Sequence, residues 1–147
     1  MNIDRILGQS HLKEKIYTSI QKKNYPQSKI IVDKDGYGGL NMAIEIAKGL
    51  LESNTYSGDI LNHPDLHFSF PSFASLKENE NIYSEWLGFV KQHRFSDFNK
   101  WSNFAGNTTS QGSIKVSEID TIKKKAVLKS FLGGNKVFIL WGAETMM

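Results

Sequence analysis

The sequence contains no cysteine among its 147 residues, so it forms no disulfide and no thiolate metal site. Only four histidines are present, and the two that stand four residues apart, His63 and His67, are separated by Pro64. Because zinc needs several ligands at defined positions, we expect no metal site from these residues together with His11 and His93. No spacing of serine, histidine and aspartate indicates a catalytic triad, so we expect no catalytic residue.

Long apolar runs are also missing. No stretch comes near the roughly 18 apolar residues that cross a membrane, and the N-terminal segment Met1–Arg5 has no apolar signal core. These absences predict a soluble cytoplasmic protein without a membrane contact. The net charge of +3 is small, and it permits contact with nucleic acid or an acidic partner without requiring either.

Apolar periodicity predicts helices that alternate with strands. One helix should begin at the N-cap Ser10, and a later helix should begin at the N-cap Ser117 and end at Gly133–Gly134. This alternation indicates one α/β domain over residues 1–147 with a mainly parallel sheet. Aromatic residues at three-residue steps between 95 and 104 predict packing in the core and not base stacking. The other expected elements are helices at about 40–51 and 82–93, and strands at 29–32, 66–70 and 137–141.

The segment DKDGYGGLNM, residues 33–42, joins an apolar strand to a helix in the manner of a phosphate-binding loop. In a working loop of the form G-x-x-x-x-G-K-[ST], glycine amides wrap the phosphates, the lysine neutralises them and the hydroxyl holds magnesium. Here Asp33 stands at the first glycine position and Gly38 at the second. Gly39 and Leu40 replace the lysine and the hydroxyl. The side chains that carry the phosphate chemistry are therefore gone.

The glycines still allow the turn. We expect a vestigial phosphate loop at Gly36, Gly38 and Gly39 that binds an anion weakly at most. Two acidic side chains, Asp33 and Asp35, should weaken phosphate binding further by charge repulsion. We therefore expect no useful affinity for ATP with magnesium.

The second half of a nucleotide site is missing as well. ATPases of this kind carry an acidic pair after another apolar strand, where one carboxylate organises magnesium and the other polarises water. After the strand that begins at residue 137, these vestigial positions hold Trp141 and Gly142. Glu144 lies too far along the chain to replace the first carboxylate. The loss of both halves predicts a nucleotide-binding scaffold without catalysis.

Four segments carry a resemblance to a known family, in the same order along the chain. They are RILGQSHLKEKI (5–16), KIIVDKDGYGGLNMAIEIAKGLL (29–51), HPDLHFSFP (63–71) and SIKVSEIDTIKKKAVLKSFLGGNKVFILWGAETM (113–146). Together they resemble the clamp-loader AAA+ subunits of bacterial DNA polymerase III, and the delta-prime subunits most of all. The resemblance covers nearly the whole chain apart from about 72–105.

The resemblance implies a parallel-sheet P-loop NTPase-like (AAA+) domain that is incomplete at its C-terminus. Residues 1–147 would be its N-terminal part, with the sensor strand, lid and collar regions outside this chain. It also implies a stator-like subunit of the DNA polymerase III holoenzyme, which supports sliding-clamp loading in DNA replication without turning over ATP itself. The implied partners are the other clamp-loader subunits and, indirectly, primer–template DNA, and no cofactor is implied.

The match is not complete. Leu7-Gly8-Gln9 corresponds to the family's segment near the adenine pocket, but the four-cysteine zinc module of many relatives is absent. The family's arginine finger lies beyond the last residue of this chain. One alternative function stays open, namely a divergent nucleoside triphosphatase that uses Lys34 or Lys48 on phosphate, although neither lysine stands at a helix N-terminus.

The family's strand order, 5-1-4-3-2, makes a further prediction about the sheet. Its fourth strand would lie between the strands at 29–32 and 137–141. We expect those two strands to pair directly, or a second copy of the chain to fill the place. A third outcome is an open slot, which is unfavourable because it leaves backbone groups unpaired and apolar side chains exposed.

Overall fold

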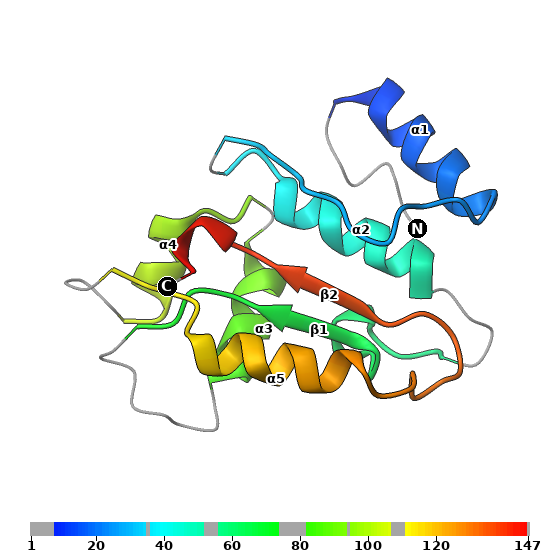
Figure 1. Ribbon diagram of the computed structural model, residues 1–147. Helices are drawn as coiled ribbons and strands as arrows, with labels where there is room; N and C mark the ends of the chain where they lie inside the picture. The colour runs from blue at the N-terminus through cyan, green and yellow to red at the C-terminus, as the bar shows by residue number, and fades with distance from the viewer. Residues whose placement is uncertain are drawn as a thin grey trace.

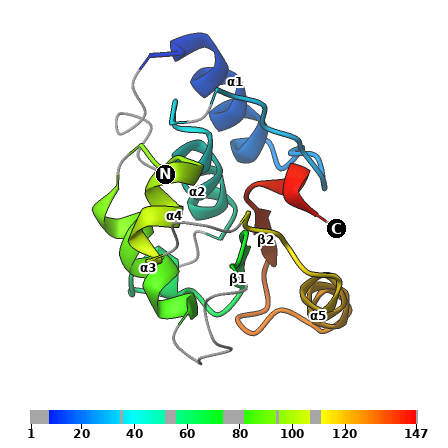
Figure 2. The same cartoon turned by 90° about the vertical axis from the view of Figure 1, so that its left-hand side faces the viewer.

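Two short parallel strands lie at the centre of the fold, with helices on both faces (Figures 1 and 2). The computed structural model describes residues 8–34, 36–51, 56–73, 82–93, 95–106 and 111–146. Strand β1 (Leu66–Ser69) pairs with β2 (Val137–Leu140), with Leu66 opposite Val137 and Ser69 opposite Leu140. Within those ranges no further strand joins the sheet. The class is α/β with a parallel sheet, as the alternation of elements predicts.

Most of the helices lie on one face of this sheet. Figure 2 shows α2 (Gly39–Leu51), α3 (Ile82–Gln92) and α4 (Phe98–Phe104) on one side and α5 (Val116–Ala126) on the other. Helix α1 (Ser10–Gln21) lies on α2, away from the sheet. Two 3₁₀ turns, Ile60–Asn62 and Ala143–Thr145, precede β1 and follow β2. No helix in the described part of the chain is long and apolar enough to cross a membrane.

The main core is aromatic and lies between the sheet and helices α2, α3 and α4. Trp86 and Trp101 are fully buried, and the ring of Phe70 stacks on Trp86 at 4.3 Å. Burial of Trp101 confirms that the aromatic stripe of the sequence packs inside the protein. Two members depart from that expectation, because Phe95 and Phe104 remain 38% and 37% exposed at the ends of the stripe.

Helix α1 is attached through a separate, smaller cluster. Ile16 packs against Met42 and Ile46 of α2, which fits the apolar spacing that predicted the helix. The expected N-cap was wrong by one position. Ser10 is already helical, and the cap residue is Gln9, which takes a left-handed conformation at φ 54° and makes no side-chain cap hydrogen bond.

Helix α5 covers the second face of the sheet loosely, since none of its residues is buried. Its cap is Lys115, so Ser117 is not the N-cap, and the helix ends at Ala126, seven residues before Gly133. The Nζ of Lys136 donates to the carbonyl oxygens of Lys125 and Leu128, so a side chain satisfies the helix end in place of a glycine turn.

A buried carboxylate ties the segment after α5 to the start of β1. Asp65 is 1% exposed, and its two oxygens accept the backbone N–H groups of Phe131 and Leu132 at 2.6 and 3.0 Å. On the same face of the sheet, the hydroxyl of Ser69 donates to Glu118 of α5 at 2.6 Å. This bond explains how a polar strand residue is buried at 1% exposure.

The strand expected at 29–32 is not formed. This stretch has no strand partner, and Ile30 and Val32 are 87% and 88% exposed. The expected direct pairing with β2 was therefore wrong, and Leu140 of β2 is 37% exposed. The physical reason is that a short apolar run favours an extended chain but does not supply the neighbouring strand that pairs with it. Among the described residues, no strand pairs with the edge of β2 that faces away from β1.

Candidate nucleotide site

The glycine segment forms a tight turn into α2, as the sequence predicts. Gly36 and Gly38 have positive φ angles of 82° and 102°, which favour glycine over residues with a Cβ. The N–H of Tyr37 donates to the Lys34 carbonyl at 3.0 Å, and the N–H of Met42 donates to Gly38 at 2.9 Å. Gly38 therefore directly precedes Gly39, the first residue of α2. The turn places the backbone of residues 36–38 at the N-terminus of this helix. Asp35 lies outside the described residues.

The end of α2 is already occupied by a carboxylate of the chain itself. Asp33 Oδ2 accepts the backbone N–H of Gly39 at 2.7 Å. A helix N-terminus attracts anions because its N–H groups are unpaired and its dipole is positive there. Asp33 supplies that negative charge internally, where a phosphate-binding loop would present the same N–H to its ligand.

The same contact explains the missing lysine. A Cβ added at Gly39 would lie 2.6 Å from Asp33 Oδ1 and 2.7 Å from its Cγ, which is closer than real Cβ contacts. Any side chain at position 39 must therefore push the Asp33 carboxylate away from the helix end. Asp33 can bond the helix end in this position only because residue 39 has no side chain.

A second segment packs over the turn. A Cβ at Gly36 would lie 3.6 Å from Asp97 Oδ2, and one at Gly38 would lie 4.0 Å from the Phe95 ring. Asp97 caps α4 by accepting the N–H of Lys100 at 2.8 Å, and it pairs with the Lys100 ammonium at 2.9 Å. Burial alone would raise the pKa of Asp97, but these bonds from Lys100 hold it below its ordinary value. A second ionised carboxylate therefore lies beside the glycine turn.

Sequence reasoning missed the position of this second carboxylate. Asp97 directly precedes the helical aromatic residue Phe98, and that order is an N-cap signal that could have placed the start of α4. Nothing in the sequence indicated that the α4 cap would lie against Gly36, because the two segments are about 60 positions apart and meet only in the tertiary fold.

The positions of the missing acidic pair are filled by packing. The ring of Trp141 lies 5.1 Å from Trp86 in the aromatic core. Gly142 has a left-handed conformation at φ 72° and ψ 38°, and a Cβ there would lie 2.8 Å from Pro71 Cγ. An acidic side chain at 142 would meet both strain and a steric clash. Position 141 is therefore used in the aromatic core, and position 142 leaves no room for a carboxylate side chain.

Neither lysine of the alternative function lies at the helix start. Lys48 belongs to the last turn of α2, and at 1.5 Å per residue it is about 13 Å along the axis from Gly39. Lys34 is exposed, and its carbonyl oxygen accepts the Tyr37 N–H within the turn. Leu7, of the segment matched to the adenine pocket, lies outside the described residues.

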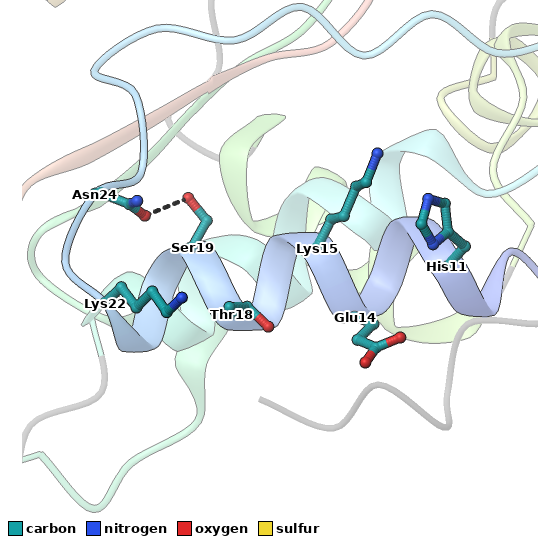
Figure 3. Close-up of a pocket in the computed structure, with 7 residues that line it drawn as sticks. All are labelled: His11, Glu14, Lys15, Thr18, Ser19, Lys22 and Asn24. Atoms are coloured by element: carbon teal, nitrogen blue, oxygen red, sulfur yellow. Dashed lines mark hydrogen bonds between the residues drawn. The ribbon is translucent and has the colours of Figure 1, made fainter.

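Other polar groups in the described part of the chain do not assemble a second site. Among the described residues, no three histidine, aspartate or glutamate side chains are placed to hold a metal ion. His63 is buried and its Nδ1 accepts the N–H of Asp65, which is a structural contact at the start of β1. The shallow hollow in Figure 3 is lined by α1 and by Lys22 and Asn24, which follow it, with Ser19 donating to Asn24 at 2.9 Å. Its charged side chains, Glu14, Lys15 and Lys22, all come from α1 or from the residue that follows it.

Comparisons with known proteins add no relative. No family model, no curated protein and no solved structure matches this chain.

Proposed function

We propose that this chain is a non-catalytic AAA+ subunit of a DNA polymerase clamp loader, of the delta-prime kind. The observation that carries the proposal is the hydrogen bond from the Gly39 N–H to the Asp33 carboxylate. It leaves the turn of a phosphate-binding loop in place and fills the anion position with a side chain of the loop itself. Such an arrangement suits a subunit that retains the scaffold of a P-loop NTPase and has no nucleotide to turn over.

The second support comes from the acidic-pair positions. Trp141 contributes its ring to the aromatic core, and Gly142 has no room for a side chain against Pro71. Magnesium-dependent hydrolysis needs a carboxylate there to organise the metal. One half of the site is thus filled by the Asp33 hydrogen bond, and the other half is filled by packed side chains. This favours a structural subunit over a divergent triphosphatase that relies on Lys34 or Lys48.

In this proposal the chain acts through contacts with other proteins. A subunit without turnover contributes a fixed surface against which ATP-hydrolysing neighbours move, and its loop geometry stays the same through their cycle. The partners are the other clamp-loader subunits within the polymerase III holoenzyme, and primer–template DNA is reached through them. The described residues contain two strands, β1 and β2. The proposal therefore includes the further claim that these two strands belong to a five-stranded AAA+ sheet.

The test is affinity purification of the tagged full-length protein from its own cells, followed by mass spectrometry. The proposal predicts recovery of the clamp-loader ATPase subunits and the sliding clamp, in amounts that do not change with the Asp33→Asn substitution. A purified protein that hydrolyses ATP alone, and that brings down none of these subunits, would overturn the proposal and support the triphosphatase.

A further inference from the structure

The end of α5 and the segment after it form a surface that is both basic and apolar. We name it the α5 patch, and it consists of Lys123, Lys124, Lys125, Val127, Leu128, Lys129 and Phe131. Its three apolar side chains are 84%, 64% and 80% exposed in that order. Figure 2 shows α5 and the following segment on the side of the molecule away from α3 and α4.

The patch lies in one of two strongly basic stretches of the chain, and the other, residues 11–34, carries the same net charge. Residues 115–136 contain six lysines and two acidic residues, a net charge of +4, whereas the whole chain carries +3. The remainder of the chain is therefore slightly negative. Lys123 pairs with Asp120 at 3.4 Å, but no carboxylate in the described part of the chain pairs with Lys124, Lys125 or Lys129. The patch offers positive charge that the described residues leave largely unneutralised.

A histidine beneath the patch, His67, has a pKa that burial and nearby lysines lower. The ring of His67 lies 4.9 Å from that of Phe138 on the face of the sheet that α5 covers. Burial, followed by the positive charges of Lys125 and Lys136, lowers the pKa of His67 below its ordinary value. Lys125 of the patch is therefore close enough to the sheet to act on His67.

The patch is held in a fixed shape. The Asp65 carboxylate binds the backbone of Phe131 and Leu132, and the Lys136 ammonium binds the carbonyls of Lys125 and Leu128. These four bonds fix the backbone that carries the exposed apolar side chains. A preorganised surface loses little conformational entropy when a partner binds, which favours a docking surface over an unstructured loop.

We propose that the α5 patch is a docking surface for an acidic segment of another protein that also carries apolar side chains. Carboxylates of that segment would pair with the unpaired lysines, and its apolar side chains would cover Val127, Leu128 and Phe131. A phosphate backbone would use the lysines and leave these three side chains exposed. A lipid surface suits a helix whose apolar face is free, whereas the apolar side of α5, with Ile119 and Ile122 partly buried, is turned to the sheet.

The test is a selection of random 12-residue peptides displayed on phage against the purified chain, followed by affinity measurement by fluorescence anisotropy. Two double variants alter the patch, Lys124→Glu/Lys129→Glu and Leu128→Ser/Phe131→Ser. Two matched controls make the same kinds of change at other exposed positions. They are Lys15→Glu/Lys22→Glu, on α1 and at its C-cap, and Ile30→Ser/Val32→Ser, before the glycine turn. Circular dichroism verifies that each variant is folded.

The proposal predicts that selected peptides combine aspartate or glutamate with leucine or aromatic residues. Each patch variant should weaken their binding about tenfold or more, while the controls stay within about twofold. Selected peptides that ignore both patch variants, or that respond equally to the controls, would overturn it. So would tighter, patch-dependent binding of a single-stranded oligonucleotide or of vesicles with anionic lipid, or a dimer that the Leu128→Ser/Phe131→Ser variant dissociates.

Discussion

The carboxylate of Asp33 lies 2.7 Å from the backbone nitrogen of Gly39 and accepts its hydrogen bond. The two residues stand at the first-glycine and lysine positions of a phosphate-binding loop, and each explains the other. The aspartate needs a neighbour without a side chain, and the helix end loses its attraction for an outside anion once the aspartate is there. In this structure the Asp33 side chain caps the N-terminus of α2 from within the chain.

Removing the cap should destabilise the protein. Asp33→Ala is expected to lower the free energy of unfolding by about 1 kcal/mol, the usual effect of losing a helix N-cap. Asp33→Asn keeps an acceptor oxygen, so it should stay within about 0.5 kcal/mol of the parent. Urea denaturation at neutral pH measures both. Equal stability of the alanine variant and the parent would show that the bond does not hold α2.

A pair of variants tests whether Asp33 excludes phosphate. Asp33→Gly combined with Gly39→Lys recreates the first glycine and the lysine of a working loop, and it should bind inorganic pyrophosphate at least about tenfold more tightly than the parent. Gly39→Lys alone is the matched control, since its ammonium would pair with the retained Asp33 carboxylate. Isothermal titration gives the affinities. A gain in the control as large as in the double variant would mean that Asp33 is not the obstacle.

Alanine substitutions at three glycines distinguish the cost of backbone strain from the cost of a steric clash at Gly142. Gly134 has no close neighbour and no positive φ, Gly133 has φ 78° and no close neighbour, and Gly142 combines φ 72° with Pro71 at 2.8 Å. Substitution by alanine should therefore cost little at 134, about 1 kcal/mol at 133 and about 2–3 kcal/mol at 142. Thermal unfolding ranks the variants. An equal loss of stability at 133 and 142 would show that the contact with Pro71 adds nothing to the cost of the substitution.

The Asp65 carboxylate should govern stability at low pH. Burial by itself would raise the pKa of Asp65, but the N–H groups of Leu132 and Phe131 hold it below the ordinary value of 3.8. A lowered folded-state pKa means that the stabilisation is complete above the ordinary value and is lost as the pH falls through the folded-state value. Asp65→Asn should cost about 2–4 kcal/mol at pH 7, and its difference from the parent should shrink below about pH 4.

Urea denaturation between pH 7 and pH 2 measures this difference. Asp120→Asn is the control, because its ion pair with Lys123 is exposed and spans 3.4 Å. Its effect on the free energy of unfolding should stay below about 0.5 kcal/mol at every pH. A constant difference between Asp65→Asn and the parent across this range would show that the carboxylate charge does not stabilise the segment after α5.

The sequence predicted those parts of the fold that rest on local patterns. Helices α2 and α3 follow apolar periodicity, and β1 and β2 follow short apolar runs, so each was expected within one or two residues of its bounds. The stretch 29–32 has the same apolar character and yet forms no strand, because a strand depends on a partner that local pattern does not reveal. The end of α5 was missed because the distant Lys136 caps it in place of a glycine.

The candidate site divides in the same way. Comparison with the phosphate-loop motif was enough to show that Gly39, Leu40, Trp141 and Gly142 lack the side chains of a working nucleotide site. The role of Asp33 could not, since the sequence suggested repulsion of phosphate and the structure adds a direct bond to the helix end. The approach of Asp97 to Gly36 joins segments far apart in the chain, and only the tertiary fold brings them together.

Isothermal titration of the parent chain with ATP and magnesium tests the central claim most directly. If Asp33 fills the anion position and no acidic pair holds the metal, the titration should show no saturable heat up to about 1 mM nucleotide, which corresponds to a binding free energy weaker than about −4 kcal/mol. A dissociation constant near 1 μM, about −8 kcal/mol, would contradict the account and establish a working nucleotide site.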